Sequence, residues 1–299
     1  MTKKSIRFLV IFSIIVILSA SILIPNPRSQ SRKNFLWKVQ SKTNTVYVLG
    51  SIHFLKKEMY PLHERIEKAF DQSDVLVVEA NLNDVGKVDM QKFIRVALYQ
   101  GDESLEKHLS AEVYEWVKKE LPEYGLPIEL ANKQKPWFLA MTLASIEILK
   151  LGFDPNYGID KYFLSKAPGK KKILELESID YQIDLLSNLS EKEQELYLTY
   201  TLKDLKIIEQ EVNKLIQTWA LGDVKYMESF IMRKVKEDPR LSIIYDKLLY
   251  QRNENMVAKI EDYLKGKETY FVVVGAGHLV GNKGIIELLK GKGFLIEQL

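Results

Sequence analysis

The chain has 299 residues, of which 46% are hydrophobic and 28% charged, and this balance predicts a folded globular protein. Its 43 basic and 40 acidic residues nearly cancel, so the composition gives no support for a nucleic-acid partner. The sequence contains no cysteine, which excludes disulfides, cysteine-ligated zinc, iron–sulfur clusters and cysteine nucleophiles. Any metal must therefore bind to His, Asp or Glu.

Residues 1–33 are predicted to lie outside the folded domain. Lys3, Lys4 and Arg7 precede an uncharged run over 8–24, which fits either a cleaved signal peptide or an uncleaved membrane anchor. Both alternatives place the rest of the chain outside the cytoplasm, as a periplasmic, secreted or membrane-anchored protein. A polar linker completes this segment, and the folded domain is expected over 34–299.

The folded domain is predicted to begin with a hairpin, a helix from Pro61 onward and a strand within 74–81 that is buried on both faces. The range 87–261 is mainly helical in pattern and holds one short candidate strand over 171–178. The chain then ends with a strand, a helix over 282–290 and a last strand. We therefore expect an α/β fold. Its central mixed sheet is built from N-terminal β-β-α-β and C-terminal β-α-β segments, with a large helical insertion over about 87–261.

Three strand-like runs each end beside a residue that can bind a metal. The run before "GSIH" leads to His53, the run "VLVV" leads to Glu79, and the run before "GAGH" leads to His278. Sites in open α/β sheets lie at the carboxyl ends of the strands, so the three side chains converge if the strands are parallel neighbours. Two imidazoles and a carboxylate would leave coordination positions open for water and substrate, as a hydrolytic metal centre requires.

The residues alone leave two interpretations of the Gly-x-x-His turns equally open. The pattern is common by chance, and the histidines of such turns often cap helices or pack against their neighbours. Two copies that each close a buried-strand pattern, in a chain with four histidines, favour a site. His63, on the polar face of a predicted helix, and His108, in a polar turn, are expected to be structural.

Two further acids have alternative roles. Glu177 follows the short candidate strand, where it is either a further ligand or general base, or a carboxylate in solvent. Glu175 lies two residues earlier and should point to the same side, because side chains alternate along a strand. Asp160 follows Gly158, where capping of a helix is a commoner role than metal ligation.

Three polar residues are candidates for substrate binding. Arg252 either binds a substrate carboxylate in a bidentate manner or pairs with a structural acid. Asn253 follows it directly, at the start of a charged helix. Ser51 lies in the first turn, where it can donate a hydrogen bond to a developing oxyanion. No adjacent His-Asp pair completes a triad with Ser51, so the sequence does not indicate a serine hydrolase.

These motifs together resemble those of the TraB/GumN family, which includes the Tiki proteases. From about residue 35 to the C-terminus the chain shows, in family order, Gly-x-x-His, a strand ending in Glu and Gly-Ile-Asp. A Leu-Glu-x-x-x-x-Gln stretch, Arg-Asn and Gly-Ala-Gly-His-Leu-Val-Gly follow. The resemblance implies a fold related to erythromycin esterase (EreA) and to haem-binding ChaN-like proteins.

The resemblance also implies an activity. Tiki-type members are metal-dependent peptidases that prefer manganese or cobalt and lack His-Glu-x-x-His; zinc is a further candidate metal. Carried over to this sequence, the metal centre becomes His53, His278 and Glu79, with Glu79 or Glu177 as the catalytic acid–base and a peptide or protein as substrate. The alternative is a non-catalytic protein that sequesters a peptide signal or haem, since some bacterial members are described as inhibitors of pheromone signalling.

Overall fold

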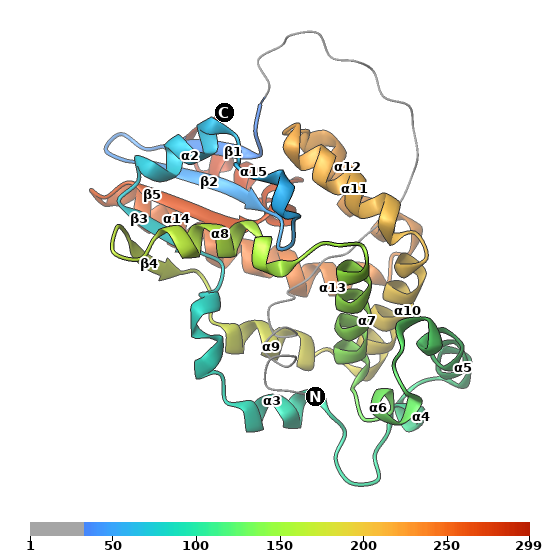
Figure 1. Cartoon of the computed structure of the whole chain (residues 1–299). Coiled ribbons are helices and arrows are strands. Elements are labelled where there is room, and N and C mark those ends of the chain that lie inside the picture. The colour runs from blue at the N-terminus through green and yellow to red at the C-terminus, as the bar shows by residue number, and fades with distance from the viewer. Residues whose placement is uncertain (1–32) are drawn as a thin grey trace.

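The computed structural model describes residues 33–299, so the predicted signal peptide or membrane anchor lies outside the described residues. Over 33–299 no helix combines the length and the apolar character that crossing a membrane would need. Figure 1 shows the strands gathered in one half of the molecule and most of the helices in the other half. The predicted α/β class is confirmed.

One mixed sheet of six strands forms the centre of the fold, in the order β4-β3-β5-β2-β1-β6. The strands are β1 Leu36–Gln40, β2 Thr45–Ser51, β3 Val75–Val78, β4 Lys172–Glu175, β5 Tyr270–Gly275 and β6 Leu295–Gln298. The predicted hairpin is β1 and β2, which are antiparallel, while β4, β3, β5 and β2 run parallel to one another. The carboxyl ends of β2, β3 and β5 therefore meet at one edge, as the sequence predicts.

The central strands are apolar along their whole length because both of their faces are covered. Every residue of β3 and of β5 is buried. On one face the aromatic rings of Phe70, Phe163 and Phe271 pack together, with ring centroids 4.8 to 5.6 Å apart. These three residues belong to two helices and to β5, so the same cluster holds the helices on the sheet.

Fourteen α-helices lie within residues 33–299. They are α2 Glu64–Asp71, α3 Met90–Ala97, α4 Leu105–His108, α5 Ala111–Glu120, α6 Ile128–Ala131, α7 Pro136–Lys150, α8 Ile159–Lys166, α9 Ile179–Ser187, α10 Glu191–Leu205, α11 Ile208–Ala220, α12 Val224–Glu237, α13 Leu241–Tyr245, α14 Gln251–Lys265 and α15 Ile285–Gly291. A π-helical turn, Asp246–Tyr250, joins α13 directly to α14. Such wide turns are rare and are often found at functional sites.

The helix predicted from Pro61 begins three residues later, at Glu64, because the His63 ring accepts a hydrogen bond from the Arg65 amide and caps it. The predicted short strand is β4, which belongs to the sheet although it lies inside the range 87–261. Before α13 and α14, that range therefore holds two helical blocks, α3–α7 and α10–α12, separated by α8, β4 and α9. Figure 1 shows both blocks to one side of the strands.

Candidate functional site

The first Gly-x-x-His turn follows β2 and presents His53 at the carboxyl edge of the sheet. The His53 Nδ1 atom lies 2.8 Å from the Oδ2 atom of Asp160, which belongs to the first turn of α8. The Ser51 hydroxyl donates to the other oxygen of the same carboxylate at 3.2 Å. Asp160 makes no capping bond in α8, so the structure gives it a role that the sequence did not predict: it orients the His53 ring. The Nε2 atom of His53 is left free.

The second turn follows β5 and presents His278 from a short 3-10 helix, Ala276–Leu279. The Nδ1 atom of His278 lies 2.6 Å from Oδ1 of Asn253, and the Asn253 Nδ2 atom donates to the backbone carbonyl of Lys283 at 2.8 Å. Since Nδ2 must donate to that carbonyl, Oδ1 is the acceptor and Nδ1 of His278 carries the proton. The Nε2 atom of His278 therefore keeps its lone pair. Asn253, predicted to bind substrate, is placed instead behind this histidine.

Glu79 lies between the two turns, directly after β3. Its Oε2 atom accepts a hydrogen bond from the Gly275 amide at 3.0 Å. Its Oε1 atom accepts from Gln182 at 2.9 Å and from the Arg252 guanidinium, and it lies 3.9 Å from Nε2 of His278. Gln182 is not among the site residues predicted from the sequence. It is the glutamine of the Leu-Glu-x-x-x-x-Gln stretch, and that motif could have indicated its position beside Glu79.

The glycine at the end of β5 allows the three side chains to converge. A Cβ atom added to Gly275 would lie 3.5 Å from Oε2 of Glu79, from Nε2 of His53 and from Cδ2 of His278. The space directly over this backbone position is therefore bounded by both imidazoles and the carboxylate. The structure thus brings together the residues predicted from the three strand ends.

Arg252 is fully buried and pairs with two acids rather than facing open solvent. Its Nε and Nη2 atoms donate to Glu177 at 2.6 to 3.1 Å, Nη2 also contacts Glu79, and Nη1 donates to the Leu248 carbonyl. Of the two roles that the sequence left open, the geometry favours pairing with structural acids. The pocket described below is not lined by Glu177, which contacts Arg252 and Gln182. Glu175 lies exposed at the end of β4.

The two histidines differ in charge. Burial alone would lower the pKa of His53, but the charge and the hydrogen bond of Asp160 outweigh it and raise that pKa to about 9. Burial, together with the Arg252 charge, lowers the pKa of His278 to about 3. His53 is therefore an imidazolium at neutral pH in the metal-free protein, and His278 is neutral.

The two carboxyl groups that pair with Arg252 also differ. Burial would raise the pKa of Glu79, but Arg252, the two histidines and the Gly275 amide hold it well below its usual range. Burial raises the pKa of Glu177, against the opposing charge of Arg252. Glu79 is thus the fixed negative charge of the site.

The donor chemistry fits a divalent metal through two histidines. Neither Nε2 atom makes a hydrogen bond with a residue that the structure describes, each Nδ1 atom is held by a second residue, and a carboxylate lies beside them, which is the usual support of metal-binding imidazoles. His53 must lose its Nε2 proton before it can bind a metal. Within residues 33–299, however, no three His, Asp or Glu side chains already form a complete ligand set. Glu79 is occupied by Arg252, Gln182 and Gly275, so it stands beside the two histidines and does not complete the set as it lies.

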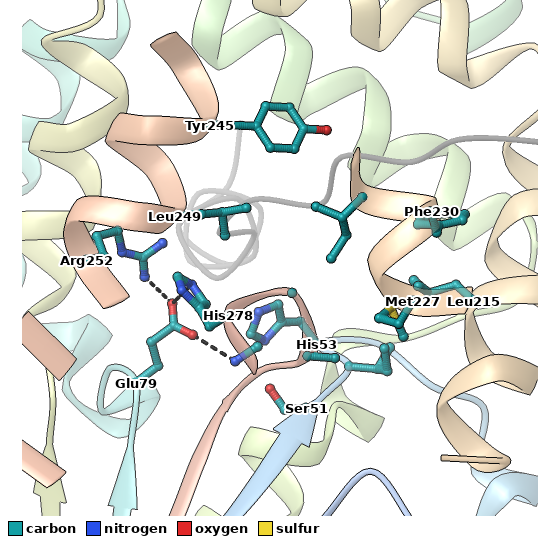
Figure 2. A pocket seen from close by; sticks show the side chains of 15 residues that line it. Ser51, His53, Glu79, Leu215, Met227, Phe230, Tyr245, Leu249, Arg252 and His278 are labelled. Atoms are coloured by element: carbon teal, nitrogen blue, oxygen red, sulfur yellow. Dashed lines mark hydrogen bonds and ion pairs between the residues drawn. The ribbon is translucent and has the colours of Figure 1, made fainter. Parts of the chain in front are cut away.

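These groups form one side of a pocket, which Figure 2 shows from close by. Ser51, His53, Glu79, Arg252 and His278 line that side, and apolar side chains of the helical insertion line the other. The other two histidines lie elsewhere: His63 caps α2, and the His108 ring lies between Glu103 and Glu191, as expected of structural residues.

Fold and site together define an α/β protein with two histidine turns and a buried Glu–Arg pair at the carboxyl edge of a mixed sheet. The TraB/PrgY/gumN family model matches residues 35–298, and the chain belongs to this family. The uncharacterized protein YbaP of Escherichia coli (strain K12) is 29% identical over 248 residues, which cover 82% of this chain and 87% of that protein.

More distant relatives carry the name of an enzyme. The metalloprotease TIKI1 of Xenopus tropicalis is 23% identical, over 90% of this chain and 62% of that protein, and the metalloprotease TIKI1 of Homo sapiens is 21% identical, over 91% and 63%. This chain therefore spans less than two thirds of these metalloproteases. No solved structure gives a significant match.

Proposed function

We propose that this protein is a metal-dependent hydrolase that acts on peptide bonds. The observation that carries the proposal is that the His53 and His278 rings and the Glu79 carboxylate surround one point beside Gly275, in the lining of a pocket. Relatives that are named metalloproteases support the hydrolase class and imply a divalent metal. The choice of a peptide substrate rests on those names.

In this proposal His53 and His278 hold the metal, with manganese or cobalt as the first candidates. A bound divalent metal supplies a Lewis acid for the scissile carbonyl and lowers the pKa of a bound water. Asn253 keeps the Nε2 lone pair of His278 directed at the site, and Asp160 does the same for His53 once its proton is released.

Glu79 is a hydrogen-bond acceptor of fixed charge in this scheme. Because its pKa is held low, it accepts a hydrogen bond from water and orients it more readily than it removes a proton. Arg252 holds the Glu79 carboxylate in place from behind. Glu177, which shares Arg252 and lies behind the pocket, is a positioning residue in this scheme.

The test compares the four histidines of one chain. Purified full-length protein is loaded with Mn²⁺, Co²⁺ or Zn²⁺ and incubated with a peptide library, and products are read by mass spectrometry. His53→Ala and His278→Ala should each abolish cleavage and lower the bound metal, while melting temperatures show that they fold. His63→Ala and His108→Ala are the matched controls and should keep both properties.

Two results would contradict the proposal. One is a His53→Ala or His278→Ala protein with the metal content and turnover of the unaltered chain. The other is a Soret absorption band on haem addition in a protein that cleaves no peptide with any of the three metals, which would indicate a haem-binding protein.

We also propose that the chain is exported, with residues 8–24 as signal peptide or anchor. The support is the basic start followed by an uncharged run. N-terminal sequencing of the native protein from extracytoplasmic and membrane fractions separates the two forms. Recovery of intact protein from the cytoplasm alone would contradict export.

A further inference from the structure

The pocket has two unlike walls. One wall carries the two histidines, Glu79 and Arg252. A second wall consists of apolar side chains from α11, α12 and the π-helical turn: Leu215, Met227, Phe230, Ile231 and Leu249. The sheet therefore supplies the chemistry, and the helical insertion supplies a surface with no charged group among those five side chains.

The apolar wall reaches the histidine turn itself. A Cβ atom on Gly277, next to His278, would lie 3.2 Å from Cδ1 of Ile231. A group bound against this wall would thus lie beside the site where His53, Glu79 and His278 converge. This continuity makes the wall part of the same binding site and not a separate surface groove.

One polar atom in this half of the pocket lacks a partner. The Tyr245 side chain is 2% exposed, and its hydroxyl makes no hydrogen bond with any of the residues that the structure describes. Burial of a hydroxyl is unfavourable unless a hydrogen bond is made, so a water or a polar group of a bound molecule is expected as its partner. Figure 2 shows Tyr245 across the pocket from Ser51, with its hydroxyl directed toward the side on which Phe230 lies.

We propose that this wall binds a large apolar side chain, such as Leu, Met or Phe, of the substrate residue that flanks the scissile peptide bond, and that the Tyr245 hydroxyl hydrogen-bonds to the main chain of the same peptide. The inference rests on the proposed function, because it names the substrates of that site. A peptide satisfies both features of the wall: it offers an apolar side chain for the five lining residues and an amide or carbonyl for the hydroxyl.

The first measurement is selectivity. A peptide library with every residue type at each position is incubated with the metal-loaded full-length protein, and kcat/KM is compared among residues at the two positions that flank the cut. Leu, Met or Phe should exceed Ala about tenfold to a hundredfold at one of the two positions, and Asp or Lys should be disfavoured there.

A variant that reduces the space along the apolar wall tests whether this wall determines the preferred residue. Ile231→Trp should shift the preferred residue toward Ala, because the larger side chain fills space beside Gly277. Leu221→Trp is the matched control, because Leu221 is exposed and outside the pocket. Its preference should equal that of the unaltered chain.

The second measurement concerns the hydroxyl. Tyr245→Phe should leave the melting temperature unchanged or raise it, since the hydroxyl has no partner to lose. The KM of a Leu-containing peptide should rise about three- to tenfold with a smaller change in kcat. Tyr250→Phe is the control: its hydroxyl bonds to Met232 outside the pocket lining, so KM should not move.

The outcomes separate this inference from the proposed function. Cleavage with no preference for large apolar residues, or a Tyr245→Phe protein with unchanged KM, overturns the inference and leaves the hydrolase standing. If no peptide is cleaved, calorimetry decides with the pair acetyl-Ala-Ala-Leu-Ala-Ala-amide and acetyl-Ala-Ala-Asp-Ala-Ala-amide. Tighter binding of the Leu peptide, weakened by Tyr245→Phe, supports the wall without the hydrolase. Equal binding of the two peptides overturns the inference. So does a result in which neither peptide binds and only a fatty acid occupies the wall.

Discussion

The two Gly-x-x-His turns share a spacing and a place in the sheet, yet they hold their histidines in opposite ways. Their strands pair in register, with Ser51 opposite Gly275. His53 is bonded to a carboxylate and its pKa is raised to about 9, whereas His278 is bonded to a neutral amide and its pKa is lowered to about 3. One motif thus supplies a charged imidazole and a neutral one.

The difference arises from residues that lie outside both motifs. The partner of His53 is 107 residues away in the sequence, and the partner of His278 is 25 residues away. Burial and the Arg252 charge, beside a neutral hydrogen-bond partner, leave the His278 lone pair available at any pH near neutrality, while the anionic partner makes His53 basic. The Gly-x-x-His motif determines where the two rings lie, and residues of α8 and α14 determine the charge of each ring.

The largest predicted effect concerns Arg252, which holds Glu79 between the two turns. Arg252→Met leaves Glu79 and Glu177 buried without their cation, so the free energy of unfolding should fall by about 3–5 kcal/mol. Urea denaturation measures the loss. Arg240→Met removes a 74% exposed arginine and is the control, with an expected loss below about 1 kcal/mol. If Arg252→Met and Arg240→Met lowered the free energy of unfolding equally, the Arg252–Glu79 pair would not hold the two turns together.

The glycines of the two turns also differ, and substitution separates them. Gly50 is packed so closely that an added Cβ would collide with the Phe35 ring and lie 3.1 Å from the Ala276 Cα atom. Gly50→Ala should therefore lower the free energy of unfolding by about 1–3 kcal/mol through overpacking. Thermal and urea denaturation are the measurements, and a fully stable Gly50→Ala protein would contradict the close approach of the two turns.

Gly275→Ala should behave in the opposite manner. The added Cβ meets its three neighbours at ordinary contact distance, so stability should change by less than about 1 kcal/mol. It nevertheless fills the space that both imidazoles and Glu79 face. We expect loss of bound metal and of peptide cleavage in a folded protein. Unchanged metal binding in Gly275→Ala would place the functional centre elsewhere.

The convergence of His53, Glu79 and His278 could be predicted from the sequence. Each follows a continuous apolar run, which is typical of parallel strands buried on both faces, and such strands place their carboxyl ends together. The short strand β4 was also predicted, although it lies in a mainly helical range.

The partners of these residues could not be predicted in the same way. Asp160 follows a glycine at the start of a helix, a position where capping is the usual role. Arg252 reads equally well as a substrate-binding or a structural residue until the fold brings Glu79 and Glu177 around it. Tyr245 lies in an ordinary helical pattern, and only packing shows that its hydroxyl has no partner. Contacts between distant segments depend on tertiary packing, which periodicity does not report.

The smallest predicted effect tests the contrast between the histidines directly. Asp160→Asn keeps a hydrogen-bond acceptor for His53 but removes the charge, so the pKa of His53 in the metal-free protein should fall below about 9, as measured by NMR titration. Folding raises this pKa from 6.5, so its stabilising contribution is full below pH 6.5 and is lost as pH rises through about 9. In Asp160→Asn the free energy of unfolding should therefore depend less on pH between pH 6.5 and about 9. Asn253→Asp is the mirror variant and should raise the pKa of His278 while leaving His53 high. If both rings titrate alike in the unaltered protein, the two turns are equivalent and the contrast in charge between their histidines is wrong.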